Sequence, residues 1–428
     1  MRKYSAQIKQ HILTLVIVFA IGFVPAMGSN SPKTLTLNDY VQIAQKNNVD
    51  IHAAFHRWKA AEERIIVAKG LPNPTLSFGY FLENVETAVG PQEYKIGVLQ
   101  KFPWFGKRKT QGEIQSARTE ILFQQLQAKR LIVIHAVKSS WYDNYYLMRA
   151  ISITRQNYDL VLNWETVVRS KYMTARAGHP DLIKTQIERI QLEDKLKSLE
   201  AKQFPILEKF RSLLNDHDLA DITVTDSLEF IPNEFSTDEI IRSAKKDNPG
   251  VLSAEQGINM NSKTLKRTKL NWYPDIGIGL DYIGTGSKVS SAESGKDPLL
   301  FKVGLDLPIW FGKTKKSIQS AKLELDAATY HLESVKNQLA VDIETTIFEL
   351  EDAERRVQLY KESLIPKSLE SLSVTEKAYI ADKVDLLTLI DAQRRHLAFT
   401  LNYEQALVQY LKSSSKLNTL TGTVEKGR

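Results

Sequence analysis

Residues that could do catalytic or metal chemistry are sparse in this sequence of 428 residues. His52 and His56 are four positions apart, a spacing that can place two metal ligands on one helix face. No glutamate lies between them and no third ligand is evident, so two surface histidines are the simpler interpretation. The chain has no cysteine, which excludes disulfides, thiolate metal sites and a cysteine nucleophile. No glycine-rich phosphate loop follows a predicted strand, so we expect no enzyme, no cofactor and no metal site.

A second set of groups follows a predicted turn near the end of the chain. Thr388 and Asp391 are three positions apart, so a helix would project both side chains to the same side. If that side lined a pore formed by several chains, the Asp391 carboxylates would form a ring that attracts cations. The alternative is a solvated carboxylate on a helix face, which is the usual position of an aspartate.

The charge of the chain narrows the possible partners. The formal net charge is +7, and it falls to about +4 when Arg2, Lys3 and Lys9 are removed with a signal peptide. No stripe of lysine and arginine interleaves with aromatic residues, so nucleic acid is not expected as a partner.

Residues 1–28 have the pattern of a secretory signal. A basic start precedes the apolar residues 12–24, and small residues occupy 26–28, where cleavage is usual. The alternative is a membrane anchor, because the apolar run is near the short limit for spanning a bilayer.

The rest of the chain contains one unit twice. Trp-Phe-Gly-Lys occurs at 104–107 and again at 310–313. Upstream residues recur at one constant offset: Ala44, Lys46, Asn48, Ala54, Lys69, Pro74 and Gly79 return as Ala244, Lys246, Asn248, Ala254, Lys269, Pro274 and Gly279. An ungapped match of this length is unlikely by chance, so we predict two copies of a helix–hairpin–helix–helix unit.

The two copies are expected at 29–218 and 237–422, with a link at 219–236 and a tail at 423–428. The first copy is predicted to contain an entering helix, a β-hairpin at 74–102, a long helix at 105–177 and a return helix at 181–214. The second should contain an entering helix, a hairpin at 275–307, a long helix at 311–380 and a return helix at 385–420. Asp181 is expected to cap the first return helix, and Pro366 to kink the second long helix. The second long helix also carries a coiled-coil seam of apolar residues spaced three and four apart.

Strict alternation of apolar and polar residues predicts four strands, each with one apolar and one polar face. Their length approaches that of a tilted membrane-spanning strand. Polar residues 83–92 are expected to form the loop of the first hairpin. Aromatic residues border the helix side of both hairpins, which is typical of a membrane–water boundary; they are Trp104, Phe105, Trp272, Tyr273, Trp310 and Phe311.

Four strands cannot close a membrane barrel, and an open sheet in lipid would leave unpaired edges. Three chains would pool about twelve strands, an accepted number for a barrel. The predicted fold class is mainly α with a small β part. Duplicated long coiled-coil hairpins and four strands per chain would build, as a trimer, a transmembrane β-barrel that the helices extend as a coiled-coil tube; the resemblance described next implies that this tube is an α-helical periplasmic tunnel.

The mature sequence resembles the TolC-type outer-membrane efflux proteins. The resemblance rests on the duplicated helix–proline–strand pattern, the two hairpins and the two turn-and-return motifs. At the second turn, Tyr379, the Asp-Leu-Leu at 385–387 and the Asp-Ala-Gln at 391–393 are similar to the tip motif of that family. At the first, Tyr172, Gly178 and the Asp-Leu at 181–182 are similar.

The resemblance implies a homotrimeric conduit in the outer membrane of a Gram-negative bacterium. Its partners would be outer-membrane lipid, a periplasmic adaptor protein and an inner-membrane pump of the resistance-nodulation-division type. The tandem Trp-Phe-Gly-Lys segments and the chain length are closest to the heavy-metal efflux branch. The sequence departs from many relatives in lacking a lipid-bearing cysteine, and from some in having Thr388 at the place of a second acidic residue.

The resemblance also suggests roles for residues at the two turns. The candidate gate and pore residues are Tyr172, Arg176, Asp181, Tyr379, Asp382, Asp385, Thr388 and Asp391. The candidate contacts of the adaptor are Gly178, His179, Lys383 and Leu386. Ordinary capping and surface charge are the alternative explanation for these side chains.

The expected function is that of a passive exit duct for metal cations or small toxic compounds. A drug-efflux or type I secretion duct of the same fold is an alternative. A secreted periplasmic coiled-coil scaffold is the alternative of another class, although it would not account for alternating strands with aromatic borders.

Overall fold

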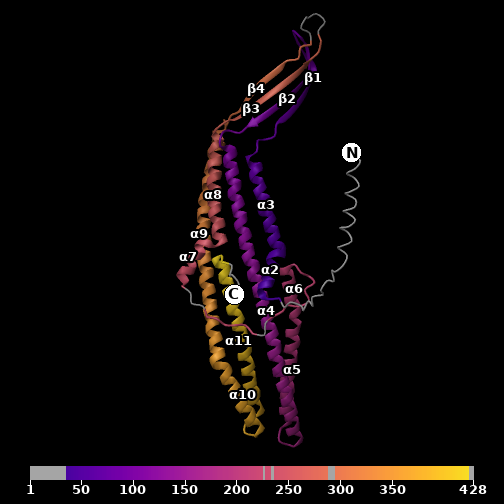
Figure 1. Ribbon diagram of the computed structural model, residues 1–428, viewed down its shortest axis with the longest axis vertical. Helices are drawn as coiled ribbons and strands as arrows, with labels where there is room; N and C mark the ends of the chain where they lie inside the picture. The colour runs from indigo at the N-terminus through magenta and orange to yellow at the C-terminus, as the bar shows by residue number, and fades with distance from the viewer. Residues whose placement is uncertain (1–34, 225–226, 233–235, 288–294, 424–428) are drawn as a thin grey trace, which may run out of the picture. The chain divides into compact units, whose positions relative to one another are not determined.

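The computed structural model describes residues 35–224, 227–232, 236–287 and 295–423. The chain divides into two units, Met1–Thr36 and Leu37–Arg428, and the helices and strands described below belong to the second. The predicted signal peptide and residues 424–428 of the tail lie outside the described residues. Figure 1 places the sheet at one end of the long helices and the two helical turns at the other.

The first copy contains α2 (Leu37–Asn47), α3 (Val49–Lys69), β1 (Thr75–Thr87), β2 (Gly90–Phe102), α4 (Lys107–Met173), α5 (His179–Ala201) and α6 (Gln203–Leu214). The second contains α7 (Thr237–Asp247), α8 (Pro249–Lys269), a short 3-10 turn (Leu270–Trp272), β3 (Asp275–Thr285) and β4 (Leu299–Asp306). It continues with α9 (Phe311–Leu359), the π-helical segment η2 (Tyr360–Leu364), α10 (Ile365–Ile380) and α11 (Leu386–Thr421). None of the described helices is both long and apolar enough to cross a membrane.

Each long helix lies beside two shorter helices of its own copy. Helix α4 packs against α3 and α5, and α9 packs against α8 and α11. Helix α4 also contacts α8 and α11, so it joins the first copy to the second. The two copies are therefore arranged side by side, with the entering and return helices of the second between the long helices.

The predicted seam of α9 is the side of the helix that packs. Ala321, Leu332 and Leu339 are buried, and the residues between them at the seam spacing are half-buried. The neighbouring charged positions are mostly exposed. Spacings of three and four residues keep one apolar stripe on the same side of a helix, which explains why this helix lies along its neighbours.

Two long helical runs are interrupted close to a proline, one at the predicted kink near Pro366 and one at a place where the sequence pattern predicted no break. The second long helix widens into η2, which ends at Leu364, two residues before Pro366. The first return helix is divided at Lys202, between α5 and α6, three residues before Pro205. Proline has no N–H to bond the carbonyl four residues earlier, and its ring clashes with that carbonyl, so the local hydrogen bonds rearrange.

The same asparagine joint occurs once in each copy. Asn48 accepts hydrogen bonds from the backbone N–H groups of the first turn of α3, and Asn248 does the same for α8. The amide of Asn48 also donates to the carbonyl of Leu213 at 2.9 Å, and that of Asn248 donates to the carbonyl of Leu420 at 2.9 Å. Each asparagine therefore links the entering helix to the end of the return helix of its copy.

The four strands form one antiparallel sheet in the order β1-β2-β3-β4. Ser77 lies opposite Gly97 in the first hairpin, and Gly277 lies opposite Gly304 in the second. Adding 200 to the β1 numbers and 207 to the β2 numbers converts the first register into the second. The two hairpins therefore share the same strand-pairing register as well as a similar sequence.

The loop expected at 83–92 is mostly strand. β1 continues to Thr87 and β2 begins at Gly90, with a shift in register between Tyr80 and Val85. The prediction was wrong because it treated polar residues as a loop, whereas a strand with exposed faces accepts polar side chains on both. The apolar rows of β1 and β4, which include Phe78 and Phe301, are exposed in the single chain.

Candidate functional site

The two helical turns have the same backbone path. The N–H of Arg176 donates to the carbonyl of Lys171 at 2.8 Å, and the N–H of Lys383 donates to the carbonyl of Ala378 at 2.8 Å. Ala175 and Asp382 occupy the left-handed region, with φ of 59° and 57°. This is the Schellman arrangement that ends a helix, here without the usual glycine.

Lys171 connects the first turn to the second. Its ammonium group donates to the carbonyl of Tyr379 at 2.7 Å and lies 2.5 Å from the Oδ1 of Asp382. It also lies 4.3 Å from the centre of the Tyr379 ring. Three favourable contacts therefore converge on one lysine whose side chain is largely buried. The hydrogen bond from Lys171 holds the pKa of Asp382 below its ordinary value, so the pair is ionised at neutral pH.

The two tip tyrosines are not equivalent. Tyr172 is exposed, and its ring lies 5.6 Å from that of His179. Tyr379 is buried and packs in a core cluster with Leu386. Burial, followed by the negative charges of Asp181 and Asp382, raises the pKa of Tyr379. Its hydroxyl has no hydrogen-bond partner among the described residues, so Tyr379 supports the tip by packing.

Asp181 does not cap the first return helix, contrary to the prediction. Helix α5 begins at His179, its cap position is Gly178, and no side chain bonds to the first turn. Asp181 lies in that first turn, 3.7 Å from Lys184. A carboxylate there still interacts favourably with the helix dipole. Arg176 is exposed and acts on Asp382 through its charge.

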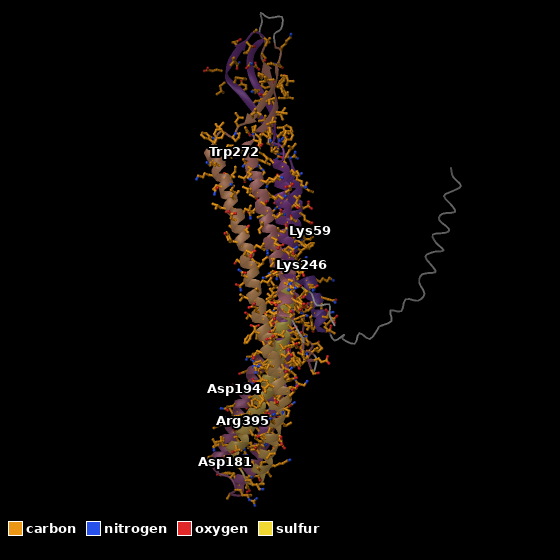
Figure 2. The ribbon with its side chains drawn as sticks, turned by 90° about the vertical axis from the view of Figure 1, so that its left-hand side faces the viewer. Lys59, Asp181, Asp194, Lys246, Trp272 and Arg395 are labelled. Carbon is orange, nitrogen blue, oxygen red and sulfur yellow. The ribbon has the colours of Figure 1, made fainter. Side chains whose placement is uncertain are left out.

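Asp385 caps the second return helix. Its carboxylate accepts hydrogen bonds from the backbone N–H of Thr388 at 2.9 Å and from the hydroxyl of Thr388 at 2.5 Å. These bonds from Thr388 lower the pKa of Asp385. Asp391 is exposed one turn further along and forms an ion pair with Arg395. Figure 2 shows Arg395 and Asp181 at the end of the helices opposite to Trp272.

Three of the four residues assigned to adaptor contact are exposed at the turns, namely Gly178, His179 and Lys383. Leu386 is only 1% exposed and belongs to the core beneath the second turn. Its side chain therefore packs inside the chain rather than facing a partner, and its assignment as an adaptor contact was wrong. The first position of a helix points inward when residues three and four positions later share its apolar stripe, as the buried Leu389 and Ile390 do here.

Partly buried polar contacts that the sequence pattern did not indicate join the two helical hairpins. Arg394 of α11 donates through Nε to Glu188 of α5 at 2.9 Å. The indole of Trp164 in α4 donates to Glu376 of α10 at 2.8 Å. Glu188 is 4% exposed, so loss of Arg394 would leave a buried charge without its partner.

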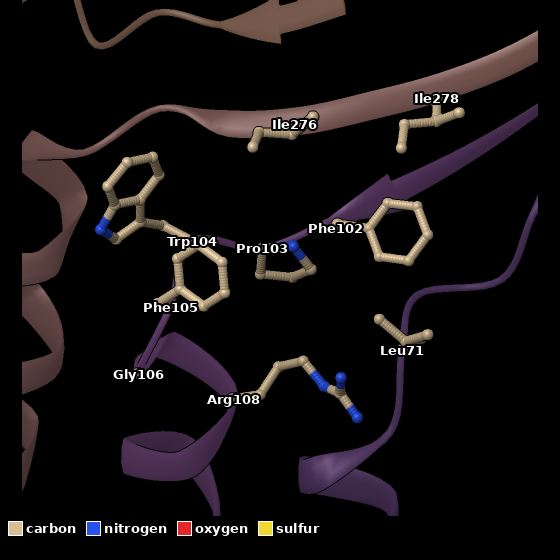
Figure 3. A pocket seen from close by; sticks show the side chains of 9 residues that line it. All are labelled: Leu71, Phe102, Pro103, Trp104, Phe105, Gly106, Arg108, Ile276 and Ile278. Atoms are coloured by element: carbon tan, nitrogen blue, oxygen red, sulfur yellow. The ribbon is translucent and has the colours of Figure 1, made fainter. Parts of the chain in front are cut away.

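Aromatic stacks mark the junction between sheet and helices. Trp104 stacks on Tyr273 with ring centres 5.3 Å apart, and Trp272 stacks on Phe311 at 5.8 Å. All six aromatic residues that border the hairpins, Trp104, Phe105, Trp272, Tyr273, Trp310 and Phe311, therefore lie at the end of the helices that meets the sheet. Figure 3 shows Trp104 and Phe105 beside the first residues of α4.

An ion pair joins the two copies at this junction. Lys107, at the first position of α4, lies 2.7 Å from the Oδ1 of Asp275 at the start of β3. The same carboxylate accepts the backbone N–H of Trp104 at 2.7 Å. Lys107 is 5% exposed, so the first Trp-Phe-Gly-Lys segment positions the second hairpin.

The polar face of the sheet carries a three-residue charge cluster. Asp281 of β3 is fully buried between Lys95 of β2 and Lys302 of β4, whose ammonium groups lie 2.7 Å and 2.6 Å from its two carboxylate oxygens. Apolar residues occupy the opposite face of the same strands. A sheet with one charged and one apolar face fits between water and lipid.

Comparison with known proteins accords with this geometry. The profile of the outer membrane efflux protein family matches residues 240–423, which is nearly the whole second copy. This match assigns the second copy to the outer membrane efflux protein family. The cobalt-zinc-cadmium resistance protein CzcC of Cupriavidus metallidurans is 18% identical over 399 residues, covering 93% of this chain and 93% of CzcC.

Solved structures share the fold. A membrane protein from Pseudomonas aeruginosa has a TM-score of 0.77 with 16% identity, covering 90% of this chain and 93% of that one. The CusC channel has a TM-score of 0.75 with 14% identity, covering 91% of this chain and 92% of that one. The predicted fold class, long helical hairpins with four strands per chain, is thereby confirmed.

The family and its fold place this efflux protein in the outer membrane, with its helices extending into the periplasm. It is an outer-membrane efflux channel of the CzcC and CusC type. The alternative of a secreted periplasmic coiled-coil scaffold is therefore set aside.

Proposed function

We propose that three copies of this chain form the exit duct of a tripartite efflux system for metal cations. The duct would receive its substrate from a resistance-nodulation-division pump through a periplasmic adaptor, and it would do no chemistry of its own. Support for the metal substrate comes from the relative named for cobalt, zinc and cadmium resistance, which aligns with 93% of this chain. The observation that supports the trimer is the β2–β3 pairing, in which the second hairpin of a chain continues the sheet of the first. The same edge-to-edge pairing of β4 with β1 would continue the sheet into the next chain.

Exposed apolar residues on α5 indicate that another chain packs against it, as α4 packs against α11 within the chain. Ile390 and Leu397 of α11 are 4% and 6% exposed because α11 packs against α4. Their counterparts in the first copy, Ile183 and Ile190 of α5, are 41% and 55% exposed. Buried apolar area stabilises an interface at roughly 25 cal/mol per Å². The long helix of a second copy of this chain would cover α5 as α4 covers α11.

The internal repeat also gives the register of the strands between chains. In the single chain Leu99 lies opposite Gly279, and Val98 lies opposite Leu280. The offsets that convert one hairpin into the other place Asp306 of β4 opposite Gly79 of β1 in the next chain. Leu305 then lies opposite Tyr80, so apolar side chains share one face of the joined sheet.

Disulfide cross-linking tests this assembly without interference, because the chain has no cysteine of its own. The double variant Gly79→Cys, Asp306→Cys should give cross-linked trimers under mild oxidation, because opposite Cα atoms lie within reach of a disulfide. A side chain added at Gly79 meets no atom within 4 Å. The control Gly79→Cys, Lys302→Cys displaces one cysteine by four positions, about 13 Å along a strand. Equal cross-linking of both variants, or of neither, would contradict the proposed register.

The substrate is tested by growth. A strain without this gene should gain sensitivity to zinc, cobalt or cadmium, and complementation should remove it. Sensitivity to hydrophobic drugs alone would favour a drug-efflux duct, and loss of a secreted polypeptide would favour type I secretion. The docking site is tested by co-purification. The adaptor should co-purify with the wild-type chain, and replacing Lys383 and His179 together should abolish its co-purification.

A further inference from the structure

The strand–helix junction contains an apolar cavity that the channel function does not use. It has a volume of about 400 Å³ and is lined by Leu71, Phe102, Trp104, Ile276, Ile278 and Arg108, among others. Figure 3 shows Arg108 on the helix side of the cavity and Ile276 and Ile278 on the sheet side. This volume is within the range of sites that hold small apolar ligands.

The cavity belongs to the lipid-facing side of the sheet. Ile276 and Ile278 lie in the apolar row of β3, on the opposite face from the charge cluster around Asp281. Phe105, beside the cavity, is 83% exposed in the chain. Because the helices extend into the periplasm, this site lies at the periplasmic surface of the outer membrane.

Arg108, at the cavity, has N–H donors that its contacts within the described part of the chain do not use. Arg108 donates through Nε and Nη2 to the carbonyl of Lys69, the last residue of α3, at 2.9 Å and 2.5 Å. Its Nη1 makes no hydrogen bond to any described residue. These bonds hold the guanidinium group at the opening, where a planar donor set suits a phosphate group.

A basic collar surrounds the junction, which we define as residues 66–71, 101–109, 266–275 and 306–316. These four segments contain eleven lysines and arginines but two carboxylates, Asp275 and Asp306. Both carboxylates are already paired, with Lys107 and Lys101 respectively. The positive charges of the remaining lysines and arginines are complementary to a layer of anionic phosphate groups, as in basic segments beside a membrane.

We propose that this cavity binds one phospholipid of the periplasmic leaflet, with an acyl chain against Ile276 and Ile278 and its phosphate on Arg108. The proposal rests on the strands of the efflux channel lying in the outer membrane. The bound lipid would fix the position of α3 and α4 relative to the membrane surface, because Arg108 joins both helices at the point of contact.

The test is native mass spectrometry of the detergent-purified assembly with three matched probes. Dioleoyl phosphatidylglycerol should be retained by the wild-type chain. Dioleoylglycerol, which has no phosphate, and glycerol phosphate, which has no acyl chain, should both be lost. Equal retention of dioleoylglycerol would show that the phosphate is not recognised, and binding of glycerol phosphate would show a simple anion site. Either result would overturn the proposal.

Variants identify the residues. Arg108→Gln should lower retention of the phospholipid at least about tenfold, and Arg108→Lys should restore part of it because the charge remains. Leu71→Trp narrows the cavity without changing the charge and should also lower retention. Lys322→Gln, at an exposed position of α9 away from the collar, is the control and should bind like the wild type.

Wild-type retention in both Arg108→Gln and Leu71→Trp would reject the site. Single-channel conductance, measured on the same preparations, keeps this question separate from the channel proposal. A chain that conducts but retains no phospholipid would refute the lipid site alone.

Discussion

Lys171 and Asp382 form an ion pair, with 2.5 Å between Nζ and Oδ1, that joins the turn of the first helical hairpin to the turn of the second. The pair has no counterpart elsewhere in the repeat. At the equivalent place in the second copy Ala378 stands for Lys171, and Ala175 stands for Asp382 in the first. The Lys171–Asp382 ion pair therefore joins the two turns of one chain. The equivalent contact between neighbouring chains would pair Ala378 with Ala175 and could form no ion pair.

Removing this ion pair should loosen the contact between the two turns. Asp382→Asn keeps the size of the side chain but loses its charge, so we expect a few-fold rise in basal single-channel conductance. Lys171→Met should act in the same direction and more strongly, because it also removes the bond to the carbonyl of Tyr379. Unchanged conductance in both variants would show that the pair does not restrain the tip.

The same pair predicts a pH dependence. Because Lys171 lowers the pKa of Asp382, the tie is fully formed above the ordinary aspartate pKa of about 3.9. It is lost only as the pH falls through the lower folded value. The ratio of conductance between Asp382→Asn and the wild type should therefore stay constant from about pH 5 to pH 8. A ratio that falls toward one near pH 5 would contradict the lowered pKa.

Asp391 and Arg395 should set the ion preference of the tip in opposite directions. If this exposed pair faces the pore, Asp391→Asn should reduce cation preference and block by multivalent cations, whereas Arg395→Gln should increase cation preference. Reversal potentials in a salt gradient measure both. Glu324→Gln, on a distant part of α9, is the control. Unchanged selectivity in both tip variants would mean that this side of α11 does not line the pore.

The two asparagine joints should contribute to stability alike. Asn48→Ala and Asn248→Ala each remove a helix cap and a bond to a distant carbonyl, so each should lower the free energy of unfolding by about 1–3 kcal/mol. Thermal loss of helical circular dichroism in detergent is the measurement. Asn163→Ala, at an exposed position inside α4, should be neutral or slightly stabilising. A loss at only one of the two joints would show that the copies are not energetically equivalent.

Trp104 and Trp310 should both lie at headgroup depth, but to different degrees. Trp310 is 73% exposed, whereas Trp104 is half-buried and stacks on Tyr273. In chains with the other tryptophans replaced by phenylalanine, headgroup-depth quenchers should reduce the fluorescence of Trp310 more than that of Trp104. Quenching only by labels deep in the acyl region would contradict the boundary position.

Periodicity and repetition predicted most of the fold because they report on packing that recurs along the chain. The seam of α9 and the paired asparagines Asn48 and Asn248 are of this kind. The loop expected at 83–92 failed because a strand with two exposed faces has no apolar signal to distinguish it from a loop. The division of the return helix at Lys202 could have been read from Pro205.

The candidate site was harder to predict because its key contacts are not repeated. Lys171 has no lysine counterpart in the second copy, and a lysine in the last turn of a helix is usually only a favourable charge near the dipole. Leu386 was misjudged because its sequence position beside Asp385 suggests the turn, whereas its side chain belongs to the core. The signal for each lies in side-chain direction, which sequence spacing alone gives poorly.

The absence of a second Lys171 has a mechanical consequence. In a ring of three chains, hairpin contacts inside each chain would be tied, and the contacts between chains would lack this tie. The two helical hairpins of each chain would then move together, so the ring would open as three rigid pairs rather than as six independent hairpins. A docking protein would need to separate only the three contacts between chains to widen the opening. These three contacts would be identical and related by rotations of one third of a turn.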